Sequence, residues 1–538
     1  MKKRHDVDVA RSDALPKVRK VTRRGFMAGA GTTAVGAGAL AATGTTATVL
    51  TSGHQRAAAQ TQQASRNFSR LFPNLPPFAS PSEGLTAALN DIGRPGGVLD
   101  AADDLSVGPV ELITDPNQSL VNVDNATHTA GTTFFGQFLD HDLTFDAASP
   151  LGVPTEPNRS PNTRTPLLDL DSLYGSGPSA SPQLYDEEDR AKLRLESGGQ
   201  FEDLPREPNN RAIIADPRND ENLMICGLQC AFICFHNDVV EVVRDEGGTL
   251  APFVFAEARR RVLHHYQWIV VHEFLPLIVG QQLVDDILRN GRRFYRPQAG
   301  ATMPVEFQGA AYRFGHSMVR PSYRANLAGD DGEPFFGMVF DPAGEGVADP
   351  VDLRGACRAP RRFIGWQTFF DFGDGNMRPN KRIDTKLSTP LFNLPMGAIA
   401  SGDAPTSLPQ RNLLRHVTWS LPSGQKIAEA MRQPQLAAGD LSELAGYGLG
   451  LDRSTPLWYY VLKEAEVMTD GLTLGPIGAR IVAEVFLGAL ELDDNSYLKQ
   501  NRGRWRPTLP RRNGRVTGEF TMVDLLTFAK VDPTSRGQ

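Results

Sequence analysis

The stretch Gly136–Asp142 reads Gly-Gln-Phe-Leu-Asp-His-Asp, and it lies inside the run Thr129–Phe145, whose apolar spacing predicts a helix. Gln137 and His141 are four residues apart, so on a helix they share one face, and Asp140 lies beside that face. Polar groups on an otherwise apolar helix are costly to bury unless they form hydrogen bonds or bind another group. A lone histidine there is more often a satisfied core residue, but here two further polar side chains accompany it. We therefore interpret this face as part of a functional site.

Helical patterns also dominate the rest of the sequence. Strong ones lie at Asn222–Arg244, Phe253–Leu275, Ser423–Arg432 and Ile477–Leu490. Strand-like alternation is scarce, and the 51 glycines and 39 prolines indicate long irregular connections. We expect a mainly α fold, in which residues 67–538 form a single large helical domain with long loops and little sheet.

The N-terminus has the pattern of an export signal. Thr22–Met27 contains a twin-arginine pair, a weakly apolar run follows from Ala28 to Leu50, and Ala57–Ala59 offers a small-residue cleavage site. We predict a twin-arginine signal peptide over residues 1–59 and a polar leader over 60–66, with the mature protein extracellular or periplasmic. An uncleaved membrane anchor is the alternative, but the many glycines and threonines of the run disfavour a stable anchor.

Charge and cysteine content exclude two classes of protein. The formal net charge is −6, and without the ten basic and three acidic residues of the first 59, the body carries 46 basic and 59 acidic residues. Such an acidic body is a poor nucleic-acid binder, so we expect no nucleic-acid partner. Four cysteines cannot build a disulfide scaffold in a chain of 538 residues. Cys226, Cys230 and Cys234 recur every four residues; we interpret them as small packing residues rather than a metal or redox cluster.

Two further polar segments stand beside apolar helical runs. In Asp216–Glu221, Arg218 and Glu221 have the i, i+3 spacing of a charge pair in the first turn of a helix, which is how we would interpret them in isolation. In Tyr312–Val319, His316 lies next to a glycine inside a helical apolar stretch, and this arrangement suits a haem ligand. Neither segment is decisive alone.

Together these segments resemble the animal-type haem peroxidase superfamily, the group of myeloperoxidase and peroxinectin, and the resemblance runs from about residue 66 onward. The small number of cysteines is similar to bacterial members of that superfamily. The resemblance implies haem b as the cofactor. The matching blocks, in chain order, are Gly136–Asp142, Thr165–Ser176, Asp216–Asn222, Phe235–Asn237, Glu257–Gly280, Tyr312–His316 and Arg411–Arg415.

The resemblance implies a role for each matching residue in the catalytic pocket. His141 matches the distal histidine, which moves a proton between the peroxide oxygens. Gln137 matches the distal glutamine, and Arg218 matches the distal arginine, which stabilises charge as the O–O bond breaks. His316 matches the proximal iron ligand. Asn412 matches the asparagine that bonds the second ring nitrogen of that ligand and fixes its orientation.

The same resemblance implies residues that hold the edge of the haem. Arg313 and Arg415 match arginines near the haem, where a propionate is the natural partner. Asp140 and Glu221 match the two carboxylates that form ester bonds to haem methyl groups. The sulfonium link of some relatives needs a methionine immediately after that glutamate. Because Asn222 stands there, we expect at most two ester bonds.

A Ca²⁺ site is also implied by the resemblance. Asp142 supplies one carboxylate, and Thr165, Leu167 (by its carbonyl), Asp169 and Asp171 supply the other ligands from an extended loop. Oxygen ligands that include three carboxylates are what Ca²⁺ prefers. A bound ion would clamp the distal histidine through its neighbour in the chain. Without the resemblance, Asp169 and Asp171 would be interpreted as an acidic turn.

The expected function is oxidation by hydrogen peroxide of a halide, a pseudohalide or a small phenolic reductant. A fatty-acid dioxygenase of the same fold is one alternative, but it needs a radical-forming tyrosine three residues before the proximal histidine. That position is Arg313, and Tyr312 is one place off. A secreted adhesion or matrix protein without turnover is the other alternative; loss of His141 or Arg218 would indicate it, and both are present. The sequence does not indicate an oligomeric state.

Overall fold

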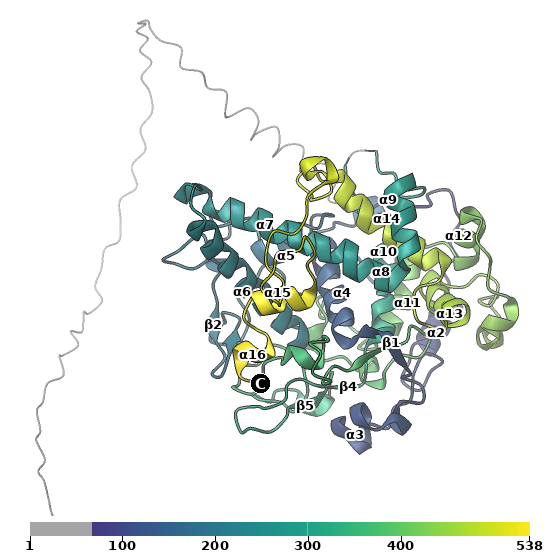
Figure 1. Ribbon diagram of the computed structural model, residues 1–538. Helices are drawn as coiled ribbons and strands as arrows, with labels where there is room; N and C mark the ends of the chain where they lie inside the picture. Colours follow the sequence, from purple (N-terminus) through teal and green to yellow (C-terminus); the bar gives the residue numbers. More distant parts are fainter. Residues whose placement is uncertain (1–66, 299) are drawn as a thin grey trace, which may run out of the picture. The chain divides into compact units, whose positions relative to one another are not determined.

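The computed structural model describes residues 67–298 and 300–538, and it is mainly helical with long irregular connections (Figure 1). This confirms the predicted fold class. The expected signal peptide over 1–59 and the polar leader over 60–66 lie outside the described residues.

The α-helices vary in length from one turn to more than six turns. They are α2 (Glu83–Ile92), α3 (Pro109–Thr114), α4 (Ala130–Leu143), α5 (Asp171–Tyr174), α6 (Leu223–Asp245), α7 (Val254–Ile269), α8 (Leu275–Val279), α9 (Gln281–Asn290), α10 (Val305–Gln308), α11 (Leu408–Thr418), α12 (Gly424–Met431), α13 (Leu457–Thr469), α14 (Pro476–Leu492), α15 (Met522–Phe528) and α16 (Pro533–Arg536). Four of the five predicted long helices are present as α4, α6, α12 and α14, with ends shifted by one or two residues.

Sheet structure in the described residues is limited to short antiparallel pairs. These are β1 (Asp124–Thr129) with β6 (Pro379–Lys381), β2 (Glu196–Ser197) with β3 (Glu202–Asp203), and β4 (Ser322–Arg324) with β5 (Phe336–Met338). The pair β1–β6 lies directly before α4, where Ala130 N donates to the carbonyl of Arg378 at 2.9 Å and fixes the start of that helix. The small amount of sheet agrees with the prediction.

Helix α4, which carries the Gly136–Asp142 motif, lies inside the helical body (Figure 1). Phe138 stacks on Phe232 of α6, with ring centroids 4.6 Å apart. Phe135 meets Tyr266 of α7 and Phe274 edge to face, at 6.3 and 5.8 Å. Aromatic burial on these sides holds the helix in one rotation about its axis, and that rotation determines which space its polar side chains enter.

Helix α6 begins where the sequence predicts it. Asn222 caps its N-terminus, since the side-chain oxygen accepts from Ile225 N at 3.0 Å. By length and apolar composition α6 could cross a membrane, but 78% of its most apolar window is buried in the fold, as is common for a core helix.

The helix predicted over Phe253–Leu275 is instead three consecutive segments. After α7 a single π turn, Val270–Phe274, leads into α8. Pro276 lies one residue into α8 and has no N–H to bond to the preceding turn. A widened π turn is a common response to such an interruption.

The helical stretch expected around His316 is present, but it is a 3₁₀ segment rather than an α-helix. Residues Ala311–Met318 form a 3₁₀ segment, here called η8, and the chain turns extended at Val319 ahead of Pro321. Short segments confined between an irregular start and a proline favour the tighter 3₁₀ winding. No atom lies within 4 Å of where a Cβ at Gly315 would stand, so the backbone beside His316 borders open space.

Candidate active site

A cavity of about 240 Å³ lies between α4 and η8. A single buried water needs roughly 10–15 Å³ on the same measure, so the space admits a much larger group. Gln137, Asp140 and His141 of α4 line it, and His316 of η8 lines it too. The shared polar face predicted for α4 is therefore confirmed, and the two histidines border one space.

His141 is held through its Nδ1 atom. That atom lies 2.7 Å from Oδ1 of Asn219, a residue that the sequence analysis did not single out. Burial, with help from the nearby Arg218, lowers the pKa of His141 to about 3. The imidazole is therefore neutral at physiological pH and can accept a proton.

Arg218 is fixed at the cavity by an acid that precedes it in sequence. Its Nε and Nη2 donate to the two carboxylate oxygens of Asp216 at 3.0 and 2.7 Å. Nη2 also donates to the carbonyl oxygens of His141 and Thr144, at 3.2 and 2.6 Å. Burial alone would raise the pKa of Asp216, but the Arg218 guanidinium outweighs burial and lowers it to about 2.

The charge pair that the i, i+3 spacing of Arg218 and Glu221 favours in isolation does not form. Among the described residues Arg218 pairs with Asp216 and, at 3.7 Å, with Asp140. The reason is local: Arg218 lies in a 3₁₀ turn, Pro217–Asp220 (here η5), before α6 begins, so the α-helical spacing does not apply.

Two carboxyl groups line the cavity on this side. Glu221 accepts from Nε2 of Gln137, whose Oε1 accepts in turn from Asn222 Nδ2 at 3.3 Å. Burial raises the pKa of Glu221 to about 8, and it also raises the pKa of Asp140. Both groups therefore favour the uncharged form more than exposed carboxyls do, which suits carboxyls that border an apolar group.

On the opposite side of the cavity, Asn412 of α11 lies against His316. The Nδ2 atom of Asn412 is 2.8 Å from Nδ1 of His316, and Oδ1 of Asn412 accepts from Nη1 of Arg313 at 3.2 Å. Burial and the neighbouring Arg313 lower the pKa of His316 to about 3, so the ring is neutral. Nε2 has no hydrogen-bond partner among the described residues, and it is the ring nitrogen that would bind a metal once the ring proton lies on Nδ1.

Positive charge is in surplus at one end of the cavity. Arg415 pairs with Asp146 at 2.7 Å, whereas no carboxylate lies within ion-pair distance of Arg313 or Arg411 in the described part of the chain. Burial lowers the pKa of Arg313 to about 10, and the neighbouring Arg415 and Arg411 act in the same direction. Anionic groups, such as the propionates of a haem, would relieve this repulsion.

A cluster of three carboxylates lies outside the lining of the cavity, where Asp142 of α4 meets Asp169 and Asp171. Carboxylate oxygens of Asp142, Asp169 and Asp171 lie within 4.8 Å of one another. Asp142 Oδ2 accepts from the Tyr266 hydroxyl at 3.0 Å, but Oδ1 is buried without a hydrogen-bond partner. Burial raises the pKa of all three carboxyls, and the charge of Asp169 raises the pKa of Asp142 and Asp171 further, that of Asp171 to about 7.

The loop that carries Asp169 and leads into Asp171 also carries the other two predicted ligands, Thr165 and Leu167. Thr165 donates through Oγ1 to Asp169 at 2.7 Å and through its backbone N–H to Asp171 at 3.0 Å. Leu167 lies between Thr165 and Asp169 in the sequence. An unpaired buried carboxylate oxygen beside two more carboxylates fits a bound divalent cation.

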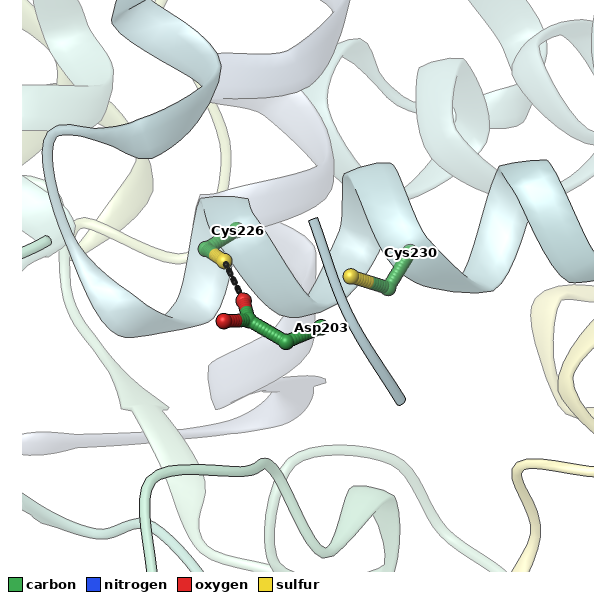
Figure 2. Close-up of side chains that lie close together, drawn as sticks. All are labelled: Asp203, Cys226 and Cys230. Carbon is green, nitrogen blue, oxygen red and sulfur yellow. Dashed lines mark hydrogen bonds between the residues drawn. The ribbon is translucent and has the colours of Figure 1, made fainter. Parts of the chain in front are cut away.

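A second cluster, made of Asp203, Cys226 and Cys230, is a poorer cation site (Figure 2). Asp203 already accepts from Arg206 at 3.0 Å and from Arg358 at 2.7 Å. The Arg206 guanidinium is also 3.7 Å from the Cys226 sulfur, so a cation here would face an arginine. The pKa values of both thiols are raised, and both side chains are buried. These observations agree with a packing role.

Comparison with known proteins finds one family. Residues 147–334 match the family model described as animal haem peroxidase. The matched range contains Arg218, Glu221 and His316 together with the acidic loop 165–171.

One relative in sequence is the "Probable oxidoreductase PXDNL" of Homo sapiens, 28% identical over 223 residues. These residues are 36% of this chain and 15% of that protein. The chain therefore spans only a small part of the length of such relatives.

Solved structures share the fold. Peroxidase A from Dictyostelium discoideum superposes with a TM-score of 0.55 at 16% identity, covering 86% of this chain and 93% of that chain. A fatty acid alpha-dioxygenase of Arabidopsis thaliana gives a TM-score of 0.52 at 15% identity, covering 80% and 74%. At these identities the likeness establishes the common fold alone.

Proposed function

We propose that this chain is a haem peroxidase of the animal type, which uses hydrogen peroxide to oxidise a halide, a pseudohalide or a small phenolic reductant. One observation carries the proposal. His141 and His316 border the same cavity from different elements, both rings are neutral, and each has its Nδ1 held by a buried asparagine. The family match over residues 147–334 supports the same conclusion.

Haem b fits the residues that line the cavity. His316 would bind the iron through Nε2. The propionates would meet Arg313 and Arg411, which have no carboxylate partner among the described residues, and Arg415 beside them. Asp140 and Glu221, with their raised pKa values, would lie at the haem edge and could form ester bonds to it. When bound, haem supplies a redox-active iron that takes oxidising equivalents from peroxide and passes them to a reductant.

The chain's own residues would handle the proton and the charge. His141, with Nδ1 occupied, presents Nε2 to the cavity as a base that takes a proton from one peroxide oxygen and returns it to the other. Arg218, clamped by Asp216, supplies a fixed positive charge as the O–O bond breaks. Gln137, bonded to Glu221, borders the same space and helps to fix the position of peroxide.

We further propose that Ca²⁺ binds Asp142, Thr165, Leu167, Asp169 and Asp171. The orphaned Oδ1 of Asp142 supports this, because a cation would give that buried oxygen a partner. The site would hold the helix that carries His141.

Export by the twin-arginine route is proposed from the sequence alone, on Arg23 and Arg24. Replacing both arginines with lysine should leave the protein in the cytoplasm. Equal export of both forms, measured by cell fractionation, would rule this route out.

The dioxygenase alternative depends on a tyrosine near His316. Tyr312 lines the cavity, but its hydroxyl donates to the carbonyl of Gly136 at 3.0 Å and its ring stacks on Phe307 at 4.7 Å. These contacts give Tyr312 a packing role and hold its hydroxyl against the backbone.

One experiment separates these functions. The protein is purified with added haem, its Soret spectrum is recorded, and guaiacol, bromide, iodide and arachidonate are tested separately, each with and without peroxide. We expect a Soret band and peroxide-dependent oxidation of guaiacol or a halide. Oxygen uptake with arachidonate alone would favour the dioxygenase, and bound haem without any turnover would favour a non-catalytic protein.

A further inference from the structure

The ring of His141 has one hydrogen-bond partner among the described residues. Oδ1 of Asn219 lies 2.7 Å from Nδ1 of the ring. Arg218, although close, bonds the backbone carbonyl of His141 and not the imidazole. Asn219 is fully buried, in the 3₁₀ turn η5 directly after Arg218. The turn η5 therefore carries both the Arg218 guanidinium and Asn219, the hydrogen-bond partner of His141.

The chemistry of the amide determines where the proton of the ring lies. An amide oxygen can only accept, so Nδ1 must carry the proton in this contact. A neutral imidazole has one ring proton, which leaves Nε2 with a free lone pair toward the cavity. The reversed tautomer would present an N–H to peroxide and could not take a proton from it.

A second amide holds Asn219 in the required orientation. Nδ2 of Asn219 donates to Oε1 of Gln229 on α6 at 2.8 Å, and Gln229 is also buried. With its nitrogen bonded to Gln229, Asn219 can only offer its oxygen to the ring. Turning the Asn219 amide alone would place its oxygen against Oε1 of Gln229, and two acceptors face to face are costly in a buried site.

We propose that Asn219 is a positioning residue that fixes His141 in the Nδ1–H tautomer, and that Gln229 sets the orientation of Asn219. The inference rests on the proposed function, because it gives the free Nε2 lone pair its use. Neither residue itself lines the cavity, so both would act through His141.

The test compares Asn219→Leu with Asn219→Asp in the haem-loaded, full-length protein. Leucine keeps most of the volume and removes the acceptor, whereas aspartate keeps an acceptor for Nδ1–H. Gln229→Met is a milder second variant, which frees the Asn219 amide to turn, should the leucine variant fail to fold.

The primary readout is the tautomer itself. Selective ¹⁵N labelling of histidine in the diamagnetic ferrous–CO form, with the His141 signals assigned by their loss in His141→Gln, reports which ring nitrogen carries the proton. We expect Nδ1–H in the wild type and in Asn219→Asp, and a loss of that preference in Asn219→Leu and, in part, in Gln229→Met.

Ligand binding gives a second readout that does not depend on turnover. Hydrogen cyanide must give up a proton to bind ferric haem as cyanide, whereas CO binds ferrous haem without one. Cyanide association should slow in Asn219→Leu by about 10-fold or more, a part of the 10²–10⁴-fold that a general base contributes in full. CO association should stay within about 2-fold of the wild type, because it needs no base.

The outcomes separate this inference from the proposed function. A wild type that binds haem but does not react with peroxide contradicts the proposed function, while the tautomer measurement still stands. A wild type with Nε2–H, or an Asn219→Leu variant with unchanged tautomer and cyanide rate in a protein that does consume peroxide, overturns this inference alone.

Discussion

Asn412 presents its amide nitrogen to Nδ1 of His316 at 2.8 Å, while Arg313 holds the amide oxygen at 3.2 Å. An amide nitrogen only donates, so Nδ1 accepts in this arrangement. Iron ligation through Nε2 of a neutral ring places the proton on Nδ1, and ligating histidines usually donate that proton to a neighbour. Haem binding therefore requires the Asn412 amide to turn, which would release Arg313 toward a propionate.

Replacing Asn412 should show whether its side chain supports haem binding by accepting the Nδ1 proton of His316. Asn412→Asp offers only acceptors, so it should retain haem without any turn of the side chain. Asn412→Leu leaves Nδ1–H without an acceptor and should weaken haem binding by about 10–100-fold, the usual cost of losing such a partner. Titration of added haem by Soret absorbance measures both affinities. Equal affinity in all three proteins would show that Asn412 does not support the ligand.

The sequence predicts the parts of this site that follow from periodicity. The shared face of Gln137 and His141 is a consequence of helical spacing, and aromatic packing around α4 turns that face to the cavity. Asn219 was not foreseen, although it stands between Arg218 and Glu221, because nothing in a linear pattern says which way a side chain of a 3₁₀ turn points.

The sequence also does not show which acid forms an ion pair with Arg218. Arg218 has acids at several nearby positions, and only the tertiary structure shows that Asp216 is its main partner. The π turn at Val270–Phe274 and the 3₁₀ segment around His316 depend on tertiary packing as well as on local residues. Helix existence was thus predictable, whereas helix type and side-chain pairing were not.

His141→Gln should leave haem bound and slow the reaction with peroxide by about 10²-fold or more, because the base is lost while the cavity stays polar. Stopped-flow spectra of the haem band measure the rate. His272→Gln, at an exposed histidine of the π turn, is the control and should react like the wild type. If the two variants react at the same rate, His141 is not the base.

Arg218→Ala should differ from His141→Gln in one respect. It should also slow the reaction, but it removes bonds to Asp216 and to the carbonyls of His141 and Thr144, so the melting temperature should fall as well. Thermal unfolding measures the fall in melting temperature, and stopped-flow traces measure the slower reaction with peroxide. A slow but fully stable variant would contradict the clamp described for Arg218.

Glu221 should make the haem-free protein sensitive to alkaline pH. Burial raises its pKa from 4.5 to about 8, so the folded state holds a proton that the unfolded state releases above pH 4.5. The stabilisation is complete below that value and is lost as pH rises toward and through 8. Glu221→Gln should therefore gain melting temperature relative to the wild type between pH 5 and 9. A constant difference across that range would show that Glu221 does not titrate there.

Covalent attachment should depend on the two carboxyls at the cavity. After cycles of peroxide, acid–acetone extraction should leave part of the haem on the wild-type polypeptide and none on the Asp140→Ala, Glu221→Ala double variant. Because an ester cannot ionise, attachment through Glu221 should also abolish the pH dependence described above. Complete extraction from matured wild type would exclude the ester bonds.

Calcium removal should loosen the helix that carries His141. Without a cation, Asp142, Asp169 and Asp171 repel one another when ionised. Burial raises all three pKa values, and the charge of Asp169 adds to this at Asp142 and Asp171. The metal-free fold is therefore penalised progressively as pH rises and the three carboxyls must ionise, Asp171 near pH 7. A bound cation reverses the sign of the interaction, and a hundredfold excess over its dissociation constant contributes about 2.7 kcal/mol.

Chelation should thus lower the melting temperature more at pH 8 than at pH 5, and peroxidase activity should fall with it although no ligand touches peroxide. Added Ca²⁺ should restore the chelated wild type but not Asp142→Asn, while Asp403→Asn, at an exposed acid, should behave as the wild type does. Metal analysis, thermal unfolding and stopped-flow rates on the same samples test this. A calcium-free protein whose stability and activity ignore chelation at both pH values would show that the three aspartates hold no ion.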